Sequence, residues 1–131
     1  IIGYREPDLK DNEIMREIVI PVPKEKGVQK FIKRGSRRAL TLSRLSLGFY
    51  AEVEDGLITE IRAAAGSMSP IPLRLSRLES ALKMRRLSPE LAKEAAAVVY
   101  DEVNPRKSPQ WRKMMTSNLV KSFLTELIEE K

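Results

Sequence analysis

The amino-acid sequence predicts an α+β fold, in which an antiparallel β-sheet of three to four strands carries about three helices packed on one face. Three observations lead to this class. Apolar residues alternate with polar residues in the first half of the chain and recur at helical spacing in the second half. Two alternating runs flank the turn sequence Asp55-Gly56, which is typical of a hairpin. Because the strands come first and the helices last, the helices can gather on a single face of the sheet.

Two strands are expected before the hairpin. Residues 17–22 (EIVIPV) are rich in β-branched side chains and run into prolines, which favours a strand at an edge of the sheet. After a polar turn at residues 24–27, residues 28–34 (VQKFIKR) alternate again, but neither side of this strand is purely apolar. The sequence therefore predicts an edge strand followed by a strand of mixed character.

The hairpin is the strongest local signal. Its alternating positions are Leu45, Leu47, Phe49, Ala51 and Val53, followed by Leu57, Thr59, Ile61, Ala63 and Ala65. A three-residue loop at 54–56 would pair Ala51 with Thr59 and place all these side chains on one face. A two-residue loop would set Ala51 opposite Glu60 instead. The pattern therefore favours the longer loop, with Gly56 in the left-handed conformation of a bulge.

Helices are expected in the remainder of the chain. Pro70 and Pro72 flank a single residue, so residues 66–74 are expected to be irregular. The sequence then predicts helices over residues 75–86, 88–103 and 108–131. Ser88 and Ser108 are each followed by proline, which predicts an N-cap and a first helical residue. A stripe in the last helix predicts core packing rather than a cofactor site: Trp111, Met115, Leu119, Phe123 and Leu127.

The composition of the chain excludes several classes of protein. The 131 residues, 42% of them hydrophobic, suffice for one core but not for two comfortable domains. Cysteine and histidine are both absent, which rules out disulfides, thiolate or zinc sites and histidine-based triads. No apolar run reaches the length of a membrane span. The chain starts without Met and without the features of a signal peptide, so we expect a fragment or excised domain of a longer protein.

Residues that could carry out catalysis are few. The carboxylates, among them Glu52 and Glu60, form no pair in an apolar setting that would separate two pKa values for acid and base roles. No glycine-rich loop of the type that cradles phosphates occurs. We therefore predict no catalytic and no metal-binding residue, and a domain that supports chemistry carried out elsewhere.

The net charge of +6 raises the alternative of a nucleic-acid-binding surface. A basic tract comprises Lys24, Lys26, Lys30, Lys33, Arg34, Arg37, Arg38 and Arg44. Phe31 is the only aromatic side chain within this tract, so a platform for stacked bases is missing. The sequence does not favour nucleic-acid binding, and the tract needs another explanation.

Several motifs resemble a known family. The segment GYREPDLKDNEIMREIVIP is similar to the one that closes the flavin-binding domain in the FAD subunit of molybdenum hydroxylases, the xanthine dehydrogenase and carbon monoxide dehydrogenase family. The segment KFIKRGSRRALTLSRLSLGFYAEVEDGLITEIRAAAGSMSPIPLR resembles the C-terminal domain of that subunit. SPQWRKMMTSNLVKSFL resembles its final helix. The motifs cover nearly the whole chain in the order of the family.

The resemblance implies an electron-transfer role. In this family a molybdenum centre oxidises the substrate, iron–sulfur clusters carry the electrons, and FAD passes them to an acceptor. Residues 1–22 would form the end of the preceding FAD-binding domain and a connecting strand, and residues 23–131 the flavoprotein C-terminal domain. This domain would form a wall beside the isoalloxazine ring, while the missing domain holds most of the FAD. The isolated chain is not expected to be active.

The resemblance also implies partners. They are the preceding FAD-binding domain and the molybdenum and iron–sulfur subunits or domains, which would hold the molybdopterin and the clusters. A cytoplasmic location is expected, with neither a membrane nor a nucleic acid as partner. The isolated domain could form a homodimer through the sheet face that the flavin domain would cover.

Two residues match family positions near the flavin ring. Met15 falls where the family places an apolar residue against the ring, and Lys33 falls on the lysine near its polar edge. An apolar cover limits the access of water, and an ammonium near the pyrimidine edge stabilises negative charge on reduced flavin. Met15 as ordinary core and Lys33 as a solvated strand residue stay open as alternatives. Tyr4 and Arg5 match the family in structural roles only.

Three arginines of the basic tract are candidates for contact with the missing domain or the partner subunits: Arg37, Arg38 and Arg44. Thr41 stands where relatives often carry Asp, and no function is transferred to it. Two other classes of function stay open, a structural interaction module without flavin contact and a basic nucleic-acid-binding domain.

Overall fold

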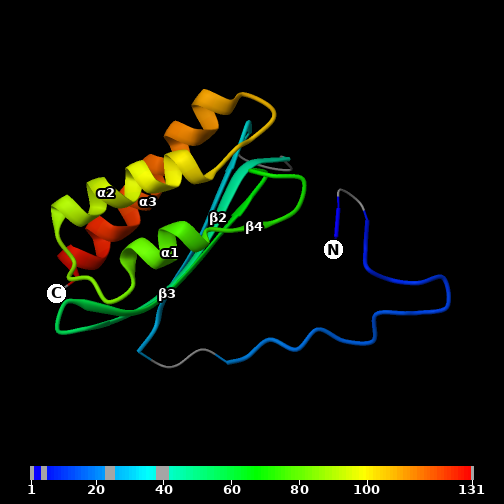
Figure 1. Cartoon of the computed structure of the whole chain (residues 1–131), viewed down its shortest axis with the longest axis horizontal. Coiled ribbons are helices and arrows are strands. Elements are labelled where there is room, and N and C mark those ends of the chain that lie inside the picture. Colours follow the sequence, from blue (N-terminus) through cyan, green and yellow to red (C-terminus); the bar gives the residue numbers. More distant parts are fainter. Residues whose placement is uncertain (1, 4–5, 23–25, 38–41, 131) are drawn as a thin grey trace.

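The computed structural model describes residues 2–3, 6–22, 26–37 and 42–130. Its strands and helices are β1 (Val28–Gly35), β2 (Ser43–Glu54), β3 (Leu57–Gly66), β4 (Leu73–Arg74), α1 (Ser76–Leu82), α2 (Pro89–Glu102) and α3 (Pro109–Glu129). The strands form one antiparallel sheet in the order β1-β2-β3-β4, so each strand pairs with its neighbours in the sequence. The three helices form a layer over one face of this sheet (Figure 1). The predicted α+β class is confirmed.

The hydrophobic core lies between the sheet and the helices. Alternate side chains of β2 and β3 point into it, because successive residues of a strand face opposite sides. The predicted stripe of α3 meets them with Leu119, Phe123 and Leu127, which are buried, while Trp111 and Met115 are half-buried. Even α3, the longest described helix, lacks an apolar stretch that could cross a membrane.

Phe49 of β2 and Phe123 of α3 join the two layers. Their rings stack with centroids 4.5 Å apart and planes inclined by 10°. Both side chains are buried. A stacked pair of this kind contributes about 0.5–1.5 kcal/mol beyond the burial of its surface. The contact therefore helps to fix α3 on the sheet.

The β2–β3 hairpin differs from the predicted one in its loop. Asp55 and Gly56, with φ of 47° and 79°, form a two-residue turn between the paired residues Glu54 and Leu57. Positive φ at both positions is what a type I′ turn requires. The prediction of a three-residue loop is therefore wrong, although Gly56 does adopt the left-handed conformation.

A β-bulge explains why the shorter turn still buries one face. The register shifts after Glu52, which pairs with Glu60, and Thr59 has no opposite residue on β2. Beyond the bulge Ala51 lies opposite Ile61, so the apolar residues share the buried face. The extra residue corrects the register that a two-residue turn alone would spoil.

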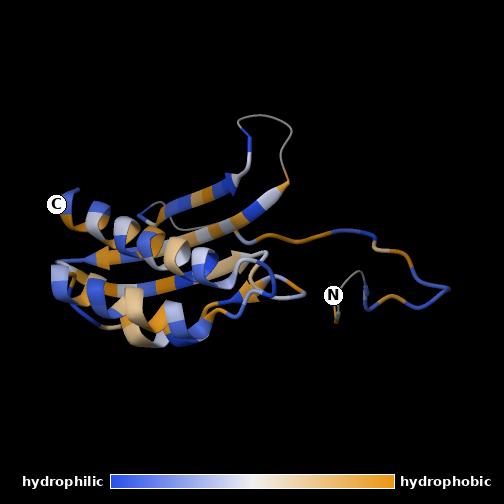
Figure 2. Cartoon of the chain, turned by 90° about the horizontal axis from the view of Figure 1, so that it is seen from above, coloured by the Kyte–Doolittle hydropathy of each residue, from blue (hydrophilic) through white to orange (hydrophobic). Residues whose placement is uncertain are grey.

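The strand predicted at residues 17–22 is not formed. This segment belongs to an arm that leaves the body of the protein, with apolar stretches along it (Figure 2). Its large apolar side chains are exposed: Ile14, Ile18, Val19, Ile20 and Val22. A strand needs a partner for its backbone groups, and no described strand pairs with the arm. The β propensity of the sequence is not enough without that partner.

The two predicted serine caps have different outcomes. The hydroxyl of Ser88 accepts a hydrogen bond from the backbone N–H of Leu91 at 3.1 Å, which confirms the cap of α2. Ser108 has a left-handed backbone, with φ of 48° and ψ of 53°, and its side chain makes no capping hydrogen bond. The predicted start of α3 is therefore confirmed, with Ser108 at the N-cap position before Pro109, but Ser108 does not cap the helix with its side chain.

The outer edge of β3 is covered by the segment that follows α1. The helix predicted to reach residue 86 ends at Leu82, and Met84 has a positive φ of 59°. The N–H of Met84 donates to the carbonyl of Ile58 at 2.8 Å, and the N–H of Ile58 donates to the carbonyl of Arg85 at 2.9 Å. These bonds satisfy backbone groups that an edge strand would otherwise expose.

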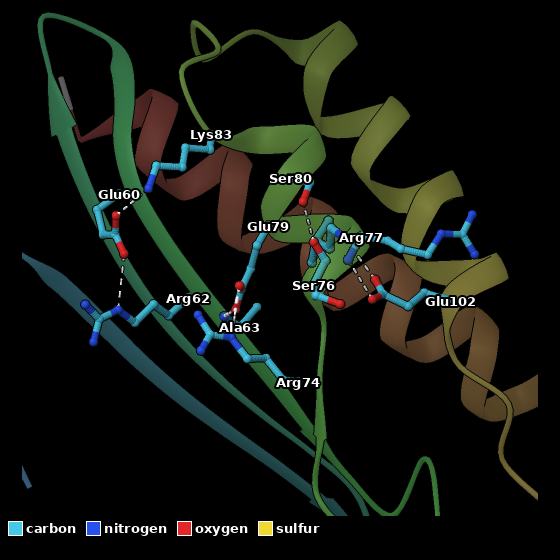
Figure 3. A network of polar contacts seen from close by, with 11 residues as sticks. Glu60, Arg62, Ala63, Arg74, Ser76, Arg77, Glu79, Ser80, Lys83 and Glu102 are labelled. Atoms are coloured by element: carbon cyan, nitrogen blue, oxygen red, sulfur yellow. Dashed lines mark hydrogen bonds and ion pairs between the residues drawn. The ribbon is translucent and has the colours of Figure 1, made fainter.

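Two carboxylates connect α1 to its neighbours (Figure 3). Glu79 of α1 accepts a hydrogen bond from the N–H of Ala63 in β3 at 2.8 Å. Glu102 of α2 accepts hydrogen bonds from the N–H groups of Arg77 and Leu78, at 2.8 and 3.0 Å. Because α1 has no side-chain cap from the residue before it, Glu102 supplies the missing acceptors.

Replacing Glu102 by alanine tests this cap. The change leaves two N–H groups of α1 without acceptors, and we expect the free energy of unfolding to fall by about 1–2 kcal/mol. Urea denaturation followed by circular dichroism measures the loss. Asp101→Ala, at the neighbouring exposed position of α2, is the matched control and should stay within about 0.5 kcal/mol of the wild type. Equal losses in both variants would contradict the capping role.

Candidate functional site

The face of the sheet that the helices do not cover is the candidate functional surface, and we call it the open face. Strand alternation places on it Gln29, Phe31 and Lys33 of β1, Ser46, Gly48, Tyr50 and Glu52 of β2, and Arg62 and Ala64 of β3. These positions are exposed or half-buried, whereas their sequence neighbours in β2 and β3 are mostly buried. The chain therefore offers a sheet surface with small, aromatic and cationic side chains.

A hollow of about 510 Å³ lies on the open face, and its lining includes Phe31, Gly48, Tyr50, Arg62 and Ala64. Phe31, Gly48 and Ala64 form one row across three strands, because Phe31 pairs with Gly48 and Gly48 pairs with Ala64. The side chain of Phe31 is 72% exposed. An exposed aromatic ring beside two very small residues gives this part of the sheet a flat, accessible surface.

Gly48 occupies a strand interior where packing does not require a glycine. A Cβ atom built on it would have Phe31 Cδ2, at 4.0 Å, as its nearest neighbour, which is ordinary van der Waals contact. Glycine inside a strand weakens the strand and often marks a place where a ligand or another backbone approaches closely. Because the fold itself does not exclude a side chain there, the hollow has the character of a docking surface for another group.

The open face carries charges of both signs: it holds Lys33 and Arg62 as well as Glu52 and Glu60, and Arg62 donates to Glu60 at 3.2 Å. The guanidinium of Arg62 lies over the ring of Tyr50, 5.8 Å from its centroid. The hydroxyl of Tyr50 donates to Glu52 at 2.5 Å. Lys33 projects from the same face and has no ion-pair partner in the described part of the chain. A polar group with negative charge would therefore find the ammonium of Lys33 near the hollow.

The two residues expected near a cofactor lie apart. Lys33 is on the open face, opposite Ser46 and two residues along β1 from Phe31. Met15 belongs to the arm and is 65% exposed, so it is not part of the core. The structure thus places Lys33 beside the hollow but does not bring Met15 to it.

The basic tract is divided between the two sides of the sheet. Lys30 pairs with Glu126 of α3 on the helix side. Arg44 lies over the ring of Trp111, with its guanidinium carbon 5.5 Å from the centroid. Lys24, Arg38, Tyr4, Arg5 and Thr41 lie outside the described residues. The cations that the structure does place therefore do not line up as one continuous track for a phosphate backbone.

The helices of this domain cover one sheet face and leave the other open, and the described residues of the open face form a surface rather than a complete active site. Residues 30–127 match the model of the CO dehydrogenase flavoprotein C-terminal domain, and the chain belongs to this family. The resemblance that the sequence motifs indicated is confirmed.

Relatives support the same assignment. The xanthine dehydrogenase FAD-binding subunit of Escherichia coli O157:H7 is 24% identical over 110 residues, which cover 84% of this chain and 38% of the relative. A relative from strain K12 matches to the same extent. The chain thus spans about two fifths of the length of these curated relatives.

Solved structures share the fold. Carbon monoxide dehydrogenase from Hydrogenophaga pseudoflava matches with a TM-score of 0.85 at 21% identity, over 92% of this chain and 43% of that chain. Carbon monoxide dehydrogenase from Oligotropha carboxidovorans matches with a TM-score of 0.71 at 14% identity, over 79% of this chain and 37% of that chain. The four-stranded sheet with three helices is therefore the fold of CO dehydrogenase flavoprotein domains.

Phe31 and Gly48 were not singled out from the sequence as site residues. The strand that carries Phe31 is mixed on both sides, so alternation alone did not show which side faces the helices. The signal that could have found them is the glycine inside the otherwise apolar run of residues 45–53, since glycine in a strand interior needs a reason.

Glu60 stands at the rim of the open face, and its pKa lies below the ordinary value of 4.5. The main cause is its hydrogen bond with Lys83, at 3.0 Å, followed by its hydrogen bond with Arg62, at 3.2 Å. Both cations favour the charged carboxylate. Lys83 follows α1, so this pair also connects the helix layer to the sheet (Figure 3).

The depressed pKa of Glu60 makes a pH-dependent contribution to stability. A group with a lowered folded-state pKa stabilises the fold above its unfolded pKa, near 4.5, and this contribution is lost as pH falls through the lower folded-state value. We expect Glu60→Gln to lose less stability than the wild type on acidification from about pH 6 to about pH 3. Thermal unfolding across that range measures it, with Glu54→Gln, an exposed carboxylate on β2, as control. Parallel profiles for the wild type and Glu60→Gln would refute the assignment.

Proposed function

We propose that the open face forms a wall beside the isoalloxazine ring of FAD, within a subunit that passes electrons from a molybdenum and iron–sulfur hydroxylase to an acceptor. The observation that carries this proposal is the hollow around Gly48, where a planar group can approach the backbone of the sheet. FAD supplies the redox chemistry when it is bound. This chain supplies surface, exclusion of water and charge.

The residues of the open face suit the ring of FAD but not its phosphates. The row from Phe31 through Gly48 to Ala64 spans two inter-strand spacings, about 10 Å, and is long enough to support a planar ring system. A surface of this kind keeps water from one side of the ring. The sequence has no glycine-rich phosphate loop, so the pyrophosphate would be held by the preceding FAD-binding domain.

Lys33 is proposed as the charge near the polar edge of the ring. It extends from the same face as the hollow, and no described carboxylate pairs with it. An ammonium group at that position favours negative charge on the pyrimidine edge and so raises the reduction potential of the cofactor. Its role is to position charge, and no covalent step is assigned to it.

Met15 is proposed as an apolar cover that the arm contributes. The arm exposes several large apolar side chains close together in the sequence, whereas an ordinary protein surface exposes such side chains singly. A covering domain explains them better than contact with water. In this proposal residues 1–22 are the end of the preceding FAD-binding domain and its connecting strand, and residues 23–131 are the flavoprotein C-terminal domain.

The proposed partners follow from the family. They are the preceding FAD-binding domain and the molybdenum and iron–sulfur subunits, which would carry the molybdopterin and the clusters in a cytoplasmic enzyme. The exposed side chain of Arg37 is a candidate for these contacts. Arg44 suits that role less, because its guanidinium is already engaged with Trp111. The isolated domain is not expected to be active, and self-association through its open face is an alternative use of that surface.

A leucine at position 48 tests the wall. In the full-length subunit that carries this domain, Gly48→Leu would fill the hollow, and we expect most of the flavin to be lost on gel filtration. The 131-residue chain itself should unfold at or above the wild-type temperature, because glycine is a poor strand residue. Asn118→Leu, at an exposed position of α3, is the matched control and should keep its flavin. Full flavin retention by Gly48→Leu would remove the hollow from the site.

The charge of Lys33 is tested through the flavin potential. We expect Lys33→Ala in the full-length subunit to lower the two-electron reduction potential by about 20–40 mV, which is about 1–2 kcal/mol. Spectroelectrochemical titration measures it. Lys93→Ala, at an exposed position of α2 in the helix layer, is the control and should leave the potential unchanged. Equal potentials in the two variants would show that Lys33 is a solvated strand residue.

Met15→Ala addresses the arm. We expect it to loosen the flavin and to leave the unfolding of the 131-residue chain unaltered, because the side chain is outside the core. Flavin release on dilution measures the first effect and thermal denaturation the second.

A full-length subunit that holds no flavin at all would instead favour a structural interaction module. A salt-dependent gel shift with generic duplex or single-stranded nucleic acid would favour a basic nucleic-acid-binding domain.

A further inference from the structure

A second cavity lies at the end of the helix layer and shares no lining residue with the hollow of the open face. Its volume is about 360 Å³, and its polar lining residues are Ser67, Ser69, Asn104, Arg106, Lys107 and Arg112. The β3–β4 loop and the α2–α3 loop, which supply most of them, lie at the same end of the molecule (Figure 1). We call it the cationic cavity, because every ionisable residue in its lining is a cation.

The positive charge of the cationic cavity is not compensated within the described part of the chain. Arg106 and Lys107 are exposed and have no ion-pair partner among the described residues. Arg112 donates one hydrogen bond, from Nη1 to the carbonyl of Ser67 at 2.6 Å, and a guanidinium has five N–H donors. Three cations around one cavity without a carboxylate repel one another, and a bound anion relieves that repulsion.

The start of α3 adds backbone donors beside this cavity. The preceding residue, Ser108, makes no capping hydrogen bond, and Pro109 has no N–H. The backbone N–H groups of Gln110 and Trp111 accordingly have no acceptor among the residues that the structure describes. Unpaired N–H groups and the positive end of the dipole of a 21-residue helix both favour an anion. At α2, by contrast, the side chain of Ser88 already serves this purpose.

The wall of the cavity formed by the β3–β4 loop is held in place. Met68 is fully buried, and the hydroxyl of Thr116 lies 3.7 Å from its sulfur. The hydroxyl of Ser67 donates to the carbonyl of Ser43 at 3.3 Å. Together with the bond from Arg112, these contacts fix the loop before any ligand arrives, so little ordering is needed on binding.

We infer that the cationic cavity binds a small molecule through a phosphate group. A phosphate carries up to two negative charges and several acceptor oxygens, which suits two guanidinium groups, an ammonium and nearby N–H donors. A cavity of about 360 Å³ is at the small end of ligand sites, large enough for a phosphate ester. This inference does not depend on the flavin proposal, because the cavity is separate from the open face.

The single tryptophan of the chain provides the readout, since Trp111 lies in the first turn of α3. The 131-residue chain is titrated with inorganic phosphate at constant ionic strength, and we expect a saturable change in tryptophan fluorescence at millimolar concentration or below. Methyl phosphate is the second probe. Similar affinity for both probes indicates a phosphate ester, and binding of inorganic phosphate alone indicates the free ion. Both results support a phosphate site, whereas a response that does not saturate overturns it.

A pair of double variants tests the location. Arg106→Gln with Lys107→Gln should weaken binding by about tenfold or more. Lys93→Gln with Lys121→Gln removes the same charge from exposed helix positions outside the cavity and should bind like the wild type. All four side chains are exposed, so folding should be unaffected, and circular dichroism checks this. Equal affinity in the two double variants would refute the inference, because binding would then follow net charge only.

Discussion

The contact between β2 and α3, centred on the stacked rings of Phe49 and Phe123, fixes which face of the sheet is available to other molecules. Both rings are buried between the layers, and the alternating apolar residues of β2 and β3 follow the same side. Because side chains of a strand alternate, this choice also sets the orientation of every residue on the other side. Lys33, Phe31 and Gly48 face outward as a result of what is buried behind them.

The two faces differ in the kind of residue they hold. The helix side is filled with buried apolar side chains, whereas the open face combines glycine and alanine with one exposed aromatic ring and charges of both signs. Small residues in a strand allow another group to approach the backbone closely. Lys33, which has no ion-pair partner among the described residues, adds a positive charge to this face, so the face suits a flat group with negative charge at one edge, and a flavin ring is the proposed neighbour.

The sequence predicted the fold class, the hairpin and the starts of α2 and α3, because alternation, helical spacing and Ser-Pro pairs reflect local preferences. It did not predict the loop of the hairpin, since a bulge at Thr59 leaves no mark except the unusual spacing of Ile58 and Ile61. The strand at residues 17–22 failed because pairing depends on a partner that local propensity cannot supply. Of the site, Lys33 followed from a family resemblance, and the role of Gly48 required knowing that nothing in the fold fills the space beside it.

The hydrogen bonds of α1 connect it to β3 and α2, so we expect these three elements to unfold locally as one unit. Glu79 bonds to β3 and Glu102 bonds back from α2, so neither helix can separate without breaking contacts of its neighbour. Amide protons of β3, α1 and α2 should therefore exchange with solvent through common, rare openings. No described strand pairs with the outer edge of β1, and its amides should exchange through smaller and more frequent ones. Of the three long strands β1, β2 and β3, the most pliant is thus the one that carries Lys33.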